Sequence, residues 1–571
     1  MNLQSMPMSD EHRRAHALTT ASILAVVAVF ALLAWHRRWI ADDGLIVVRT
    51  VRNILAGNGP VFNAFERAES NTSALWPWLL AAVCNQTGRD PVQVTVVTGW
   101  VLAIAAVAIA MDATRRWHRA HGCQSGLVPA GALVVVGCVP FWDFATSGLE
   151  TSLCWFWIAC VWWLVTALRS GSSGQFQYAT AAAIGLGPLV RPDFGLISAV
   201  FFTALCVVVR PSRRRLLGLG AVAAVLPMGY EVFRAGYYGT LVPLPALAKS
   251  AGNAEWNRGI RYLVDFIRPC WVWLPMAGLS ALGILAWAKS LIPKHTWVPI
   301  AASLASAALL TLFVVRVGGD FMHARMLLPP TFAAVLPAMV LPWRPLTRPF
   351  VIGLVGWAVV AGVYRGRGKA MATAHRVADE RAGYVRWTKT SNPVTGEVFI
   401  AAEGPAAERA ANALRDHNHV LITESGIVER ANPEYVQPII YVAGRLGTGG
   451  IVTPLDGFVV DTLGLANPLG ARIAVNQPGM TGHEKALPWS WIRAGYADPA
   501  DDINQPEAAR AEIGAARRAM KCGALAELIA STRAPLTPQR FWSNVIGALD
   551  RTRLEIPTDP HAAEAKFCSP P

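Results

Sequence analysis

Two adjacent carboxylates, Asp42 and Asp43, follow the first apolar run of the chain, in the stretch WIADDGLIVVRTVRNIL. A pair of acids can bind a divalent cation, or one acid can act as a general base on a hydroxyl group. A carboxylate beside another one also tends to have a raised pKa, which suits a base. The structural alternative is a solvated helix start, because Asp favours the first turn and the following apolar residues have helical spacing.

A second constellation is VGGDFMHARMLLPP, which offers Asp320, His323 and Arg325 within six residues. The glycine pair before them lets a backbone approach a ligand closely. His323 and Arg325 can bind a phosphate through charge-assisted hydrogen bonds. The alternative is a tight loop whose charges are merely solvated.

Further ionisable groups stand between or beside apolar runs. Arg191 and Asp193 lie in RPD, between two short apolar runs, at a depth where charges are costly and usually functional. Pairing with each other is the structural alternative. Glu150, at the start of another run, is interpreted as a first-turn acid. Lys249, in PLPALAKS, is either a phosphate ligand or a solvated loop charge, and the second interpretation is favoured.

Composition indicates where these groups are placed. The chain has 571 residues, of which 53% are hydrophobic and 15% charged, and this is too apolar for an ordinary soluble protein. Nearly all of the net charge of +14 falls in the first 364 residues, in short loops between apolar runs. That distribution predicts membrane topology rather than nucleic-acid binding.

The apolar runs are long enough to span a bilayer, which takes about 20 residues, or about 17 in an upright helix. They lie at 17–35, 92–111, 126–142, 150–168, 176–190, 194–209, 216–233, 271–289, 297–315, 327–343 and 350–364. The fifth and sixth are short and can form a re-entrant pair. The sequence therefore predicts a polytopic α-helical membrane protein with about 9 to 11 transmembrane helices.

Basic loops set the orientation, because Lys and Arg concentrate on the cytoplasmic side. The basic segments are EHRRAH, DATRRWHRAHG, RPSRRR, KSLIPKH and WRPLTR. All of them fall on one side if every run spans. We therefore expect a cytoplasmic N-terminus, a retained first helix, and a periplasmic C-terminus in a plasma-membrane protein. Arg37 and Arg38 break the pattern, but beside Trp35 and Trp39 they can snorkel into the headgroups.

The composition changes after residue 364. Short β-branched segments, EVFIAAEGP, HVLITESGIV, IIYVAG and IVTPLDGFVVDTLGL, alternate with Ala-rich stretches, and the tail at 505–550 is amphipathic. The pattern predicts a transmembrane domain at 1–364, which carries the candidate catalytic acids, and an extracytoplasmic α/β domain at 365–571.

Two residue pairs stand out in the predicted C-terminal domain. Trp489 and Trp491, in LPWSWIRAG, are predicted to be exposed, where aromatic faces suit contact with sugar rings, although packing is the commoner fate of Trp. Cys522 and Cys568 are the two cysteines of this domain, and an oxidising compartment permits a disulfide between them.

These motifs together carry a resemblance that covers nearly the whole chain. The acid pair, GNGPVFN, SNTSALW, RPD, GGDFMHARMLLP, FVVDTLGLANP and GHEKALPWSW occur in this order. The set resembles polyprenyl-phosphate-dependent glycosyltransferases of the GT-C superfamily, and more closely the AftB-type terminal β-(1→2)-arabinofuranosyltransferases of actinobacteria. The resemblance implies decaprenylphosphoryl-arabinofuranose as the donor. It implies the non-reducing ends of cell-wall arabinan as the acceptor, in arabinogalactan, with lipoarabinomannan as a further candidate.

Such a donor keeps its chain in the lipid bilayer and its phosphosugar at the interface, so the reacting groups should lie on exterior loops. Cations should stabilise the leaving phosphate while a carboxylate handles the acceptor hydroxyl. The expected phosphate ligands are Arg191, His323 and Arg325. The expected catalytic acids are Asp42 and Asp43, and the further substrate contacts are Asp193, Asp320, Lys249, Trp489 and Trp491. No nucleotide cofactor and no nucleic acid is expected, whereas a divalent cation at the acid pair stays open.

The resemblance also raises a stereochemical question. Donor and product are both β-arabinofuranosides, whereas a single in-line attack helped by a base would invert the anomeric centre. Either a carboxylate attacks first, or the acceptor attacks from the face that the phosphate leaves, with the acids serving orientation or metal binding. A transporter would need polar groups at the midplane of repeated halves, which the sequence does not offer. A non-catalytic assembly factor stays an alternative.

Overall fold

The chain forms two compact units in the computed structural model, which describes residues 10–250, 252, 254–289, 296–365, 377–416, 419–477 and 479–569. The helical unit comprises Met1–Arg38, Val97–Leu226 and Glu255–Ala382. The C-terminal unit comprises Trp39–Val96, Pro227–Ala254 and Gly383–Pro571. This division differs from the predicted boundary at residue 364, because two segments from the first half of the chain join the C-terminal unit. The acid pair is in one of them.

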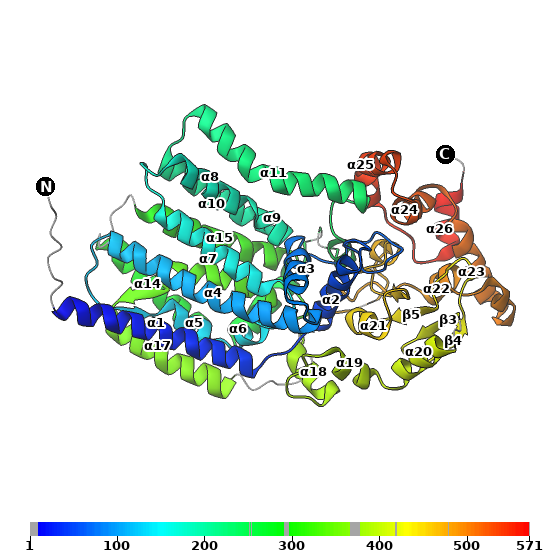
Figure 1. Ribbon diagram of the computed structural model, residues 1–571, viewed down its shortest axis with the longest axis horizontal. Coiled ribbons are helices and arrows are strands. Elements are labelled where there is room, and N and C mark those ends of the chain that lie inside the picture. The colour runs from blue at the N-terminus through cyan, green and yellow to red at the C-terminus, as the bar shows by residue number, and fades with distance from the viewer. Residues whose placement is uncertain are drawn as a thin grey trace. The chain divides into compact units, whose positions relative to one another are not determined.

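The helical unit is a bundle of long apolar helices. Its elements are α1 (Asp10–His36), most of α4 (Pro91–Ala120), α5 (Gly131–Gly137), α6 (Val139–Phe144), α7 (Thr151–Ala167), α8 (Gly174–Gly185), α9 (Gly187–Val190), α10 (Gly195–Val209), the first half of α11 (Arg213–Tyr237), α13 (Trp256–Ile267), α14 (Trp273–Ala288), α15 (Trp297–Arg316), α16 (Leu328–Val335) and α17 (Arg348–Val360). Helices α4, α7, α10 and α15 run side by side in Figure 1.

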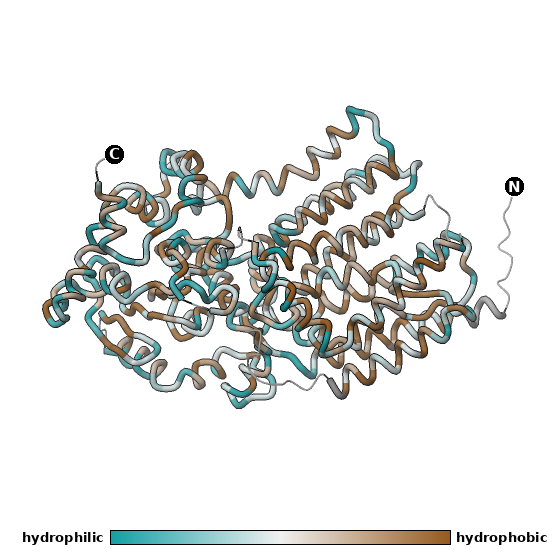
Figure 2. Tube along the Cα trace, turned by 180° about the vertical axis from the view of Figure 1, so that it is seen from behind, coloured by the Kyte–Doolittle hydropathy of each residue, from teal (hydrophilic) through white to brown (hydrophobic). Residues whose placement is uncertain are grey.

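Five helices of the described chain are long and apolar enough to cross a membrane: Ala15–His36, Pro91–Ala120, Pro192–Val209, Arg213–Tyr238 and Trp297–Arg316. Three shorter apolar helices, Thr151–Ala167, Trp273–Ala288 and Arg348–Val363, accompany them. Figure 2 shows the apolar residues along these helices in brown. Many are solvent-exposed, as expected of side chains that face lipid, and the predicted multi-pass helical membrane protein is confirmed.

Two predicted spans are interrupted. In run 126–142, strand β1 (Leu127–Pro129) precedes two short helices that are separated at Cys138. In run 327–343, prolines break the helix and strand β2 (Val340–Pro342) follows, paired antiparallel with β1. Neither run is therefore a continuous spanning helix, because proline removes a helical hydrogen bond and glycine weakens the helix. Of the basic segment KSLIPKH, residues 290–295 lie outside the described residues.

The prediction that Arg37 extends into the lipid headgroups is wrong. Its guanidinium forms two hydrogen bonds with the buried carboxylate of Asp143, Nε to Oδ1 at 2.6 Å and Nη2 to Oδ2 at 2.9 Å. Arg381 lies 3.6 Å from the same carboxylate. Arg38 instead stacks over the ring of Trp35 at 4.8 Å. The break in the charge pattern after the first span is therefore explained in part by a buried ion pair.

The C-terminal unit contains a four-stranded sheet in the order β4-β3-β5-β6. Its strands are β3 (Val420–Thr423), β4 (Val428–Arg430), β5 (Ile439–Ala443) and β6 (Phe458–Asp461), with β3, β5 and β6 parallel and β4 antiparallel to β3. Strands β5 and β6 are buried throughout, as parallel strands covered on both faces usually are. The predicted α/β architecture is confirmed.

Helices surround this sheet. They are α2 (Asp42–Leu55), α3 (Leu75–Thr87), α12 (Leu244–Ala248), α18 (Glu380–Thr388), α19 (Gly396–Glu403), α20 (Pro405–Arg415), α21 (Leu446–Val452), α22 (Trp489–Tyr496), α23 (Glu507–Ala519), α24 (Gly523–Arg533), α25 (Pro538–Arg553) and α26 (Pro560–Cys568). The helical tail is as predicted. The segment EVFIAAEGP is not a strand but forms α19, which buries Phe399 against α2 and α21 residues.

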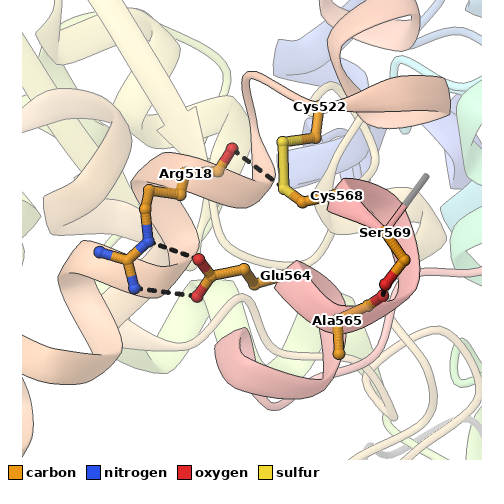
Figure 3. The surroundings of a disulfide bond; sticks show 6 residues. All are labelled: Arg518, Cys522, Glu564, Ala565, Cys568 and Ser569. Carbon is orange, nitrogen blue, oxygen red and sulfur yellow. Dashed lines mark hydrogen bonds and ion pairs between the residues drawn. A yellow bond between two sulfur atoms is a disulfide. The ribbon is translucent and has the colours of Figure 1, made fainter.

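A disulfide joins Cys522, just before α24, to Cys568 at the end of α26, across 46 residues of sequence. Figure 3 shows that Arg518 and Glu564 form an ion pair beside it, with Nη2 and Oε2 2.9 Å apart. The ion pair ties α23 to α26, and the disulfide ties the start of α24 to the end of α26. The disulfide that the sequence permitted is therefore formed, and the other seven cysteines are free.

Candidate active site

Asp42 is the first residue of α2, and its carboxylate is held by the start of α21. Oδ2 accepts a hydrogen bond from the amide of Gly447 at 2.9 Å. Oδ1 accepts two from Thr448, from the amide at 2.7 Å and from the hydroxyl at 2.7 Å. Three donors therefore fix this carboxylate in one orientation.

Burial raises the pKa of Asp42 to about 6, and the charge of Asp43 adds to the increase, while the bonds from Gly447 and Thr448 oppose it. The neighbouring acid, which the sequence suggested as the cause, is the smaller contribution. A carboxyl group with this pKa is mostly ionised at neutral pH and close to the pH at which proton transfer is efficient. Asp43, the next residue of α2, is half-buried and projects about 100° away around the helix.

Glycines in the run RLGTGG allow α2 and α21 to touch. A Cβ on Gly447 would lie 1.9 Å from the backbone oxygen of Asp42, and one on Gly450 would lie 2.9 Å from Cδ of Arg49. A side chain at Gly447 could not be accommodated without moving the helices apart. Sequence reasoning missed Gly447 and Thr448, and the available signal was a glycine-rich stretch directly after a buried strand.

Arg49 anchors α2 deeper in the unit. Its fully buried guanidinium donates to the carbonyls of Phe62 at 2.9 Å, Gly450 at 2.8 Å and Thr453 at 2.6 Å. Such a charge is tolerated only because backbone oxygens satisfy its donors. The helix that carries both acids is therefore rigidly positioned.

The GNGPVFN motif serves the same attachment. The side chain of Asn63 receives a hydrogen bond from the amide of Val459 in β6 at 3.0 Å and returns one to its carbonyl at 2.9 Å. Asn53, on α2, donates to the carbonyls of Val61 and Phe62 at 3.1 and 2.9 Å. These asparagines fasten the segment after α2 to the sheet.

Arg191 and Asp193 of the RPD motif pair with each other, the alternative that the sequence left open. Nε of Arg191 lies 3.0 Å from Oδ1 of Asp193, and Nη1 lies 2.6 Å from Oε1 of Glu150. Glu150 directly precedes α7 but makes no side-chain cap, so its ion pair rather than helix capping is the observed role. One cation is thus held by two acids, all three nearly buried in the helical unit.

In the loop at 318–325, the charged side chains are also paired. Nε of Arg325 lies 2.5 Å from Oδ2 of the buried Asp320, and Nδ1 of His323 lies 2.7 Å from Oδ2 of Asp265 on α13. Burial lowers the pKa of His323, but the hydrogen bond and charge of Asp265 more than offset it, so its pKa is raised. The arrangement favours a positively charged imidazole.

The glycine pair of this loop has a structural use. Gly318 and Gly319 have φ of 86° and 75°, a left-handed conformation that other residues rarely adopt. A Cβ on Gly319 would lie 2.3 Å from the ring of Tyr262, whose hydroxyl donates to the carbonyl of Met322 at 2.9 Å. The close approach is therefore to α13 rather than to a ligand.

Lys249 follows α12, and its aliphatic stem lies against Gly482, where a Cβ would be 3.0 Å from its Cε. Lys485, which the sequence reasoning did not single out, is buried in the same region. Its Nζ donates to the carbonyls of Leu247 at 2.8 Å and Ala471 at 2.9 Å, and burial lowers its pKa. The motif GHEKALPWSW thus fastens the loop before α22 to α12.

The predicted exposure of the two tryptophans is wrong for Trp491, which is 1% exposed. Its Nε1 donates to the carbonyl of Thr558 at 3.0 Å, inside the main hydrophobic core of the C-terminal unit. Trp489 is half-buried and packs against that core. Both rings pack against the hydrophobic core, which is the commoner fate of large aromatic side chains.

The acid pair is a poor match for a cation. Both carboxylate oxygens of Asp42 already accept hydrogen bonds, which leaves little coordination capacity. Among the described residues, no group of three or more His, Cys, Asp and Glu side chains could hold a metal ion. Two acids alone would supply fewer ligands than a divalent cation prefers.

The predicted site residues divide between the units. Those of the C-terminal unit are Asp42, Asp43, Lys249, Trp489 and Trp491, and those of the helical unit are Arg191, Asp193, Asp320, His323 and Arg325. Within each unit the structure brings charged groups together with partners that the sequence did not identify, Thr448 for Asp42 and Asp265 for His323.

Comparison with known proteins places this arrangement in a family. Residues 412–566 match the AftB family C-terminal domain. The chain is 33% identical to a terminal β-(1→2)-arabinofuranosyltransferase of Mycobacterium tuberculosis, over 94% of this chain and 95% of the relative. It is 33% identical to an enzyme of the same name from Corynebacterium glutamicum, over 97% of this chain and 88% of the relative.

A solved structure, ArnT from Cupriavidus metallidurans bound to undecaprenyl phosphate, is similar with a TM-score of 0.42 and 15% identity, covering 77% of this chain and 89% of that one. The two relatives, in contrast, match almost the entire chain. The chain therefore belongs to the family of terminal β-(1→2)-arabinofuranosyltransferases.

Proposed function

We propose that the enzyme transfers arabinofuranose from decaprenylphosphoryl-arabinofuranose to the non-reducing ends of cell-wall arabinan, in arabinogalactan and as a further candidate in lipoarabinomannan, forming terminal β-(1→2) links. Family membership supports the sugar and the linkage, and the multi-pass helical bundle suits a donor whose lipid chain stays in the bilayer. The observation that carries the proposal is Asp42, an oriented carboxylate with a pKa of about 6.

Asp42 is assigned to binding the hydroxyl group of the acceptor and accepting its proton. A carboxylate has about four lone-pair sites, and three are used by Gly447 and Thr448, with Oδ2 accepting only one bond. Oδ2 can therefore accept a hydrogen bond from the acceptor hydroxyl and receive its proton. Asp43, pointing elsewhere on the helix, is assigned to orienting the sugar.

The same hydrogen bonds bear on the stereochemistry. The three donors hold the carboxylate of Asp42 in place and leave Oδ2 one acceptor site, which is assigned to the acceptor hydroxyl, and this assignment disfavours a glycosyl-enzyme. The acceptor oxygen instead attacks the anomeric carbon from the face that the phosphate leaves. The new carbon–oxygen bond forms as the bond to phosphate breaks, the phosphate leaves with the bonding electrons, and the hydroxyl proton goes to Asp42.

Binding of the donor phosphate is assigned to three cationic side chains of the helical unit. His323, held positively charged by Asp265, and Arg325, oriented by Asp320, supply cationic donors on one loop. Arg191 is kept charged and oriented by Glu150 and Asp193. These acids hold each cation in a fixed geometry, as preorganised stabilisation of a leaving anion requires. Lys249 is assigned to the glycan acceptor, together with the half-buried Trp489.

The active face is placed on the periplasmic side of the plasma membrane, with a cytoplasmic N-terminus. The basic loops support this orientation. The bond between Cys522 and Cys568 supports it independently, because structural disulfides persist in oxidising compartments. A reporter fused after residue 571 that is active only in the cytoplasm would contradict the orientation.

The test uses the full chain in lipid nanodiscs, radiolabelled decaprenylphosphoryl-arabinofuranose and a defined arabinan acceptor. Linkage analysis of the product should give terminal β-(1→2)-arabinofuranose, and Asp42→Asn should abolish most of it. The matched control is Glu507→Gln, which neutralises an exposed first-turn acid of α23 and should leave the rate unchanged. A different linkage, or no transfer by a folded wild-type enzyme, would overturn the proposal.

A further inference from the structure

Helix α25 has one face that is buried in the C-terminal unit and an opposite face with exposed apolar side chains. Asn544, Ala548 and Arg551 are buried on one face. Trp542, Ile546 and Leu549, at spacings of four and three residues, are 58%, 83% and 44% exposed on the opposite face. At 100° per residue these three side chains fall within an arc of about 60°. An exposed apolar stripe of this size needs a partner.

The buried face of α25 is attached to the end of a membrane-spanning helix. Nδ2 of Asn544 donates to the carbonyl of Gly236 at 2.9 Å, and the ring of Phe541 lies where a Cβ on Gly236 would be 2.1 Å from it. Nε of Arg551 donates to the carbonyl of Gly239 at 2.9 Å. Figure 1 shows α25 beside this end of α11.

That attachment fixes the depth of α25. The span Arg213–Tyr238 has 26 residues and is therefore about 39 Å long, longer than the roughly 30 Å hydrocarbon core. Gly236 lies in the last turn of this span and Gly239 directly follows it, so the excess length of the helix puts both in the headgroup region. In the apolar stretch of this span only 6% of the residues are buried, and Met228 and Val232 are 62% and 46% exposed, so the helix faces lipid as far as Val232, about one turn before Gly236.

We propose that α25 is an interfacial helix whose stripe of Trp542, Ile546 and Leu549 inserts into the headgroup region of the bilayer and docks the C-terminal unit on the lipid surface. The stripe lies on a helix that is attached about one turn beyond the last lipid-exposed residue of α11, and Trp is preferred at the membrane interface. An amphipathic helix lying in the membrane plane with Trp and Leu on one face is a common form of such contact. The proposal does not depend on the identity of the donor or acceptor.

The experiment labels single introduced cysteines with bimane in the full chain, in nanodiscs of phosphatidylcholine with or without bromine on the acyl chains. Ile546→Cys is the probe, and Val436→Cys, at a residue 82% exposed in the same unit, is the matched control. The unmodified chain supplies the background from its seven free cysteines. The melting temperature of each labelled protein is compared with that of the unmodified chain.

Brominated lipid should quench bimane at position 546 several-fold more than at position 436, and the emission at 546 should shift to the blue. Leu549→Cys should behave as Ile546→Cys does. Equal quenching at 546 and 436 in proteins of unchanged melting temperature would overturn the proposal and leave the stripe as a surface for a protein partner. If Ile546→Cys lowers the melting temperature, Leu549→Cys decides by the same comparison.

Discussion

The carboxylate of Asp42 accepts two hydrogen bonds from Thr448, one from its amide and one from its hydroxyl, across 406 residues of sequence. This contact joins the first turn of α2 to the first turn of α21 inside the C-terminal unit. It orients one of the two adjacent acids and lowers its pKa against the effect of burial. It also makes the role of that acid separable from the role of its neighbour.

We expect Asp42→Asn and Asp43→Asn to be unequal. The amide of Asn at position 42 would bring N–H donors toward those of Gly447 and Thr448, so the loss should be about 10²- to 10⁴-fold, typical of a lost acid–base group. Asp43→Asn should also lower the activity, but much less, because this residue is assigned only to orienting the sugar. The measurement is kcat with labelled donor. Equal losses with rescue of the Glu variants by added metal would indicate a shared cation instead, and two fully active variants would remove both acids from the site.

The pH dependence should follow the Asp42 carboxyl group. Because it accepts the proton only when ionised, kcat/KM should fall as the pH falls through about 6. Thr448→Val removes a hydrogen bond that lowers the pKa of Asp42, so the acidic limb should move upward, by about half a unit to one unit for a bond worth roughly 0.5–1.5 kcal/mol. Thr448→Ser should restore the wild-type profile. A limb that stays in place in Thr448→Val would show that another group controls it.

Arg191 should have separable roles in stability and donor binding. Arg191→Gln leaves Glu150 and Asp193 as nearly buried carboxylates without their cation, which should cost about 3–5 kcal/mol of stability and raise the KM for donor. Adding Glu150→Gln and Asp193→Asn should recover the melting temperature but not the KM. If the triple variant also recovers the KM, the role of Arg191 is purely structural.

Reduction should loosen the helical tail. The disulfide closes a loop across 46 residues, and its removal in Cys522→Ser should cost about 2–5 kcal/mol of stability. Dithiothreitol should lower the melting temperature of the wild type equally and leave that of the variant unchanged. Quantitative thiol labelling of both cysteines in protein isolated from its own envelope would contradict the bond.

Local features of the sequence determined the membrane character, the buried strands β5 and β6 and the helical tail, because hydropathy, run length and β-branched content are properties of short segments. The disulfide was also predictable, since the C-terminal domain offers one pair of cysteines. The acid pair was found for the same reason, as two adjacent residues with a stated chemistry. The interrupted runs at 126–142 and 327–343 were not found, because composition alone does not show where prolines and a small β-pairing stop a helix.

The tertiary structure decided which residues meet. Thr448 reaches Asp42 only because Gly447 has no side chain, and Lys485 reaches Leu247 only because the loop before α22 folds against the distant helix α12. Trp491 is buried because α22 packs on a core drawn from six other helices and strands, which no local pattern encodes. Hydropathy is set residue by residue, whereas burial and hydrogen-bond partners depend on the close packing of segments hundreds of residues apart, and that packing is a property of the folded chain alone.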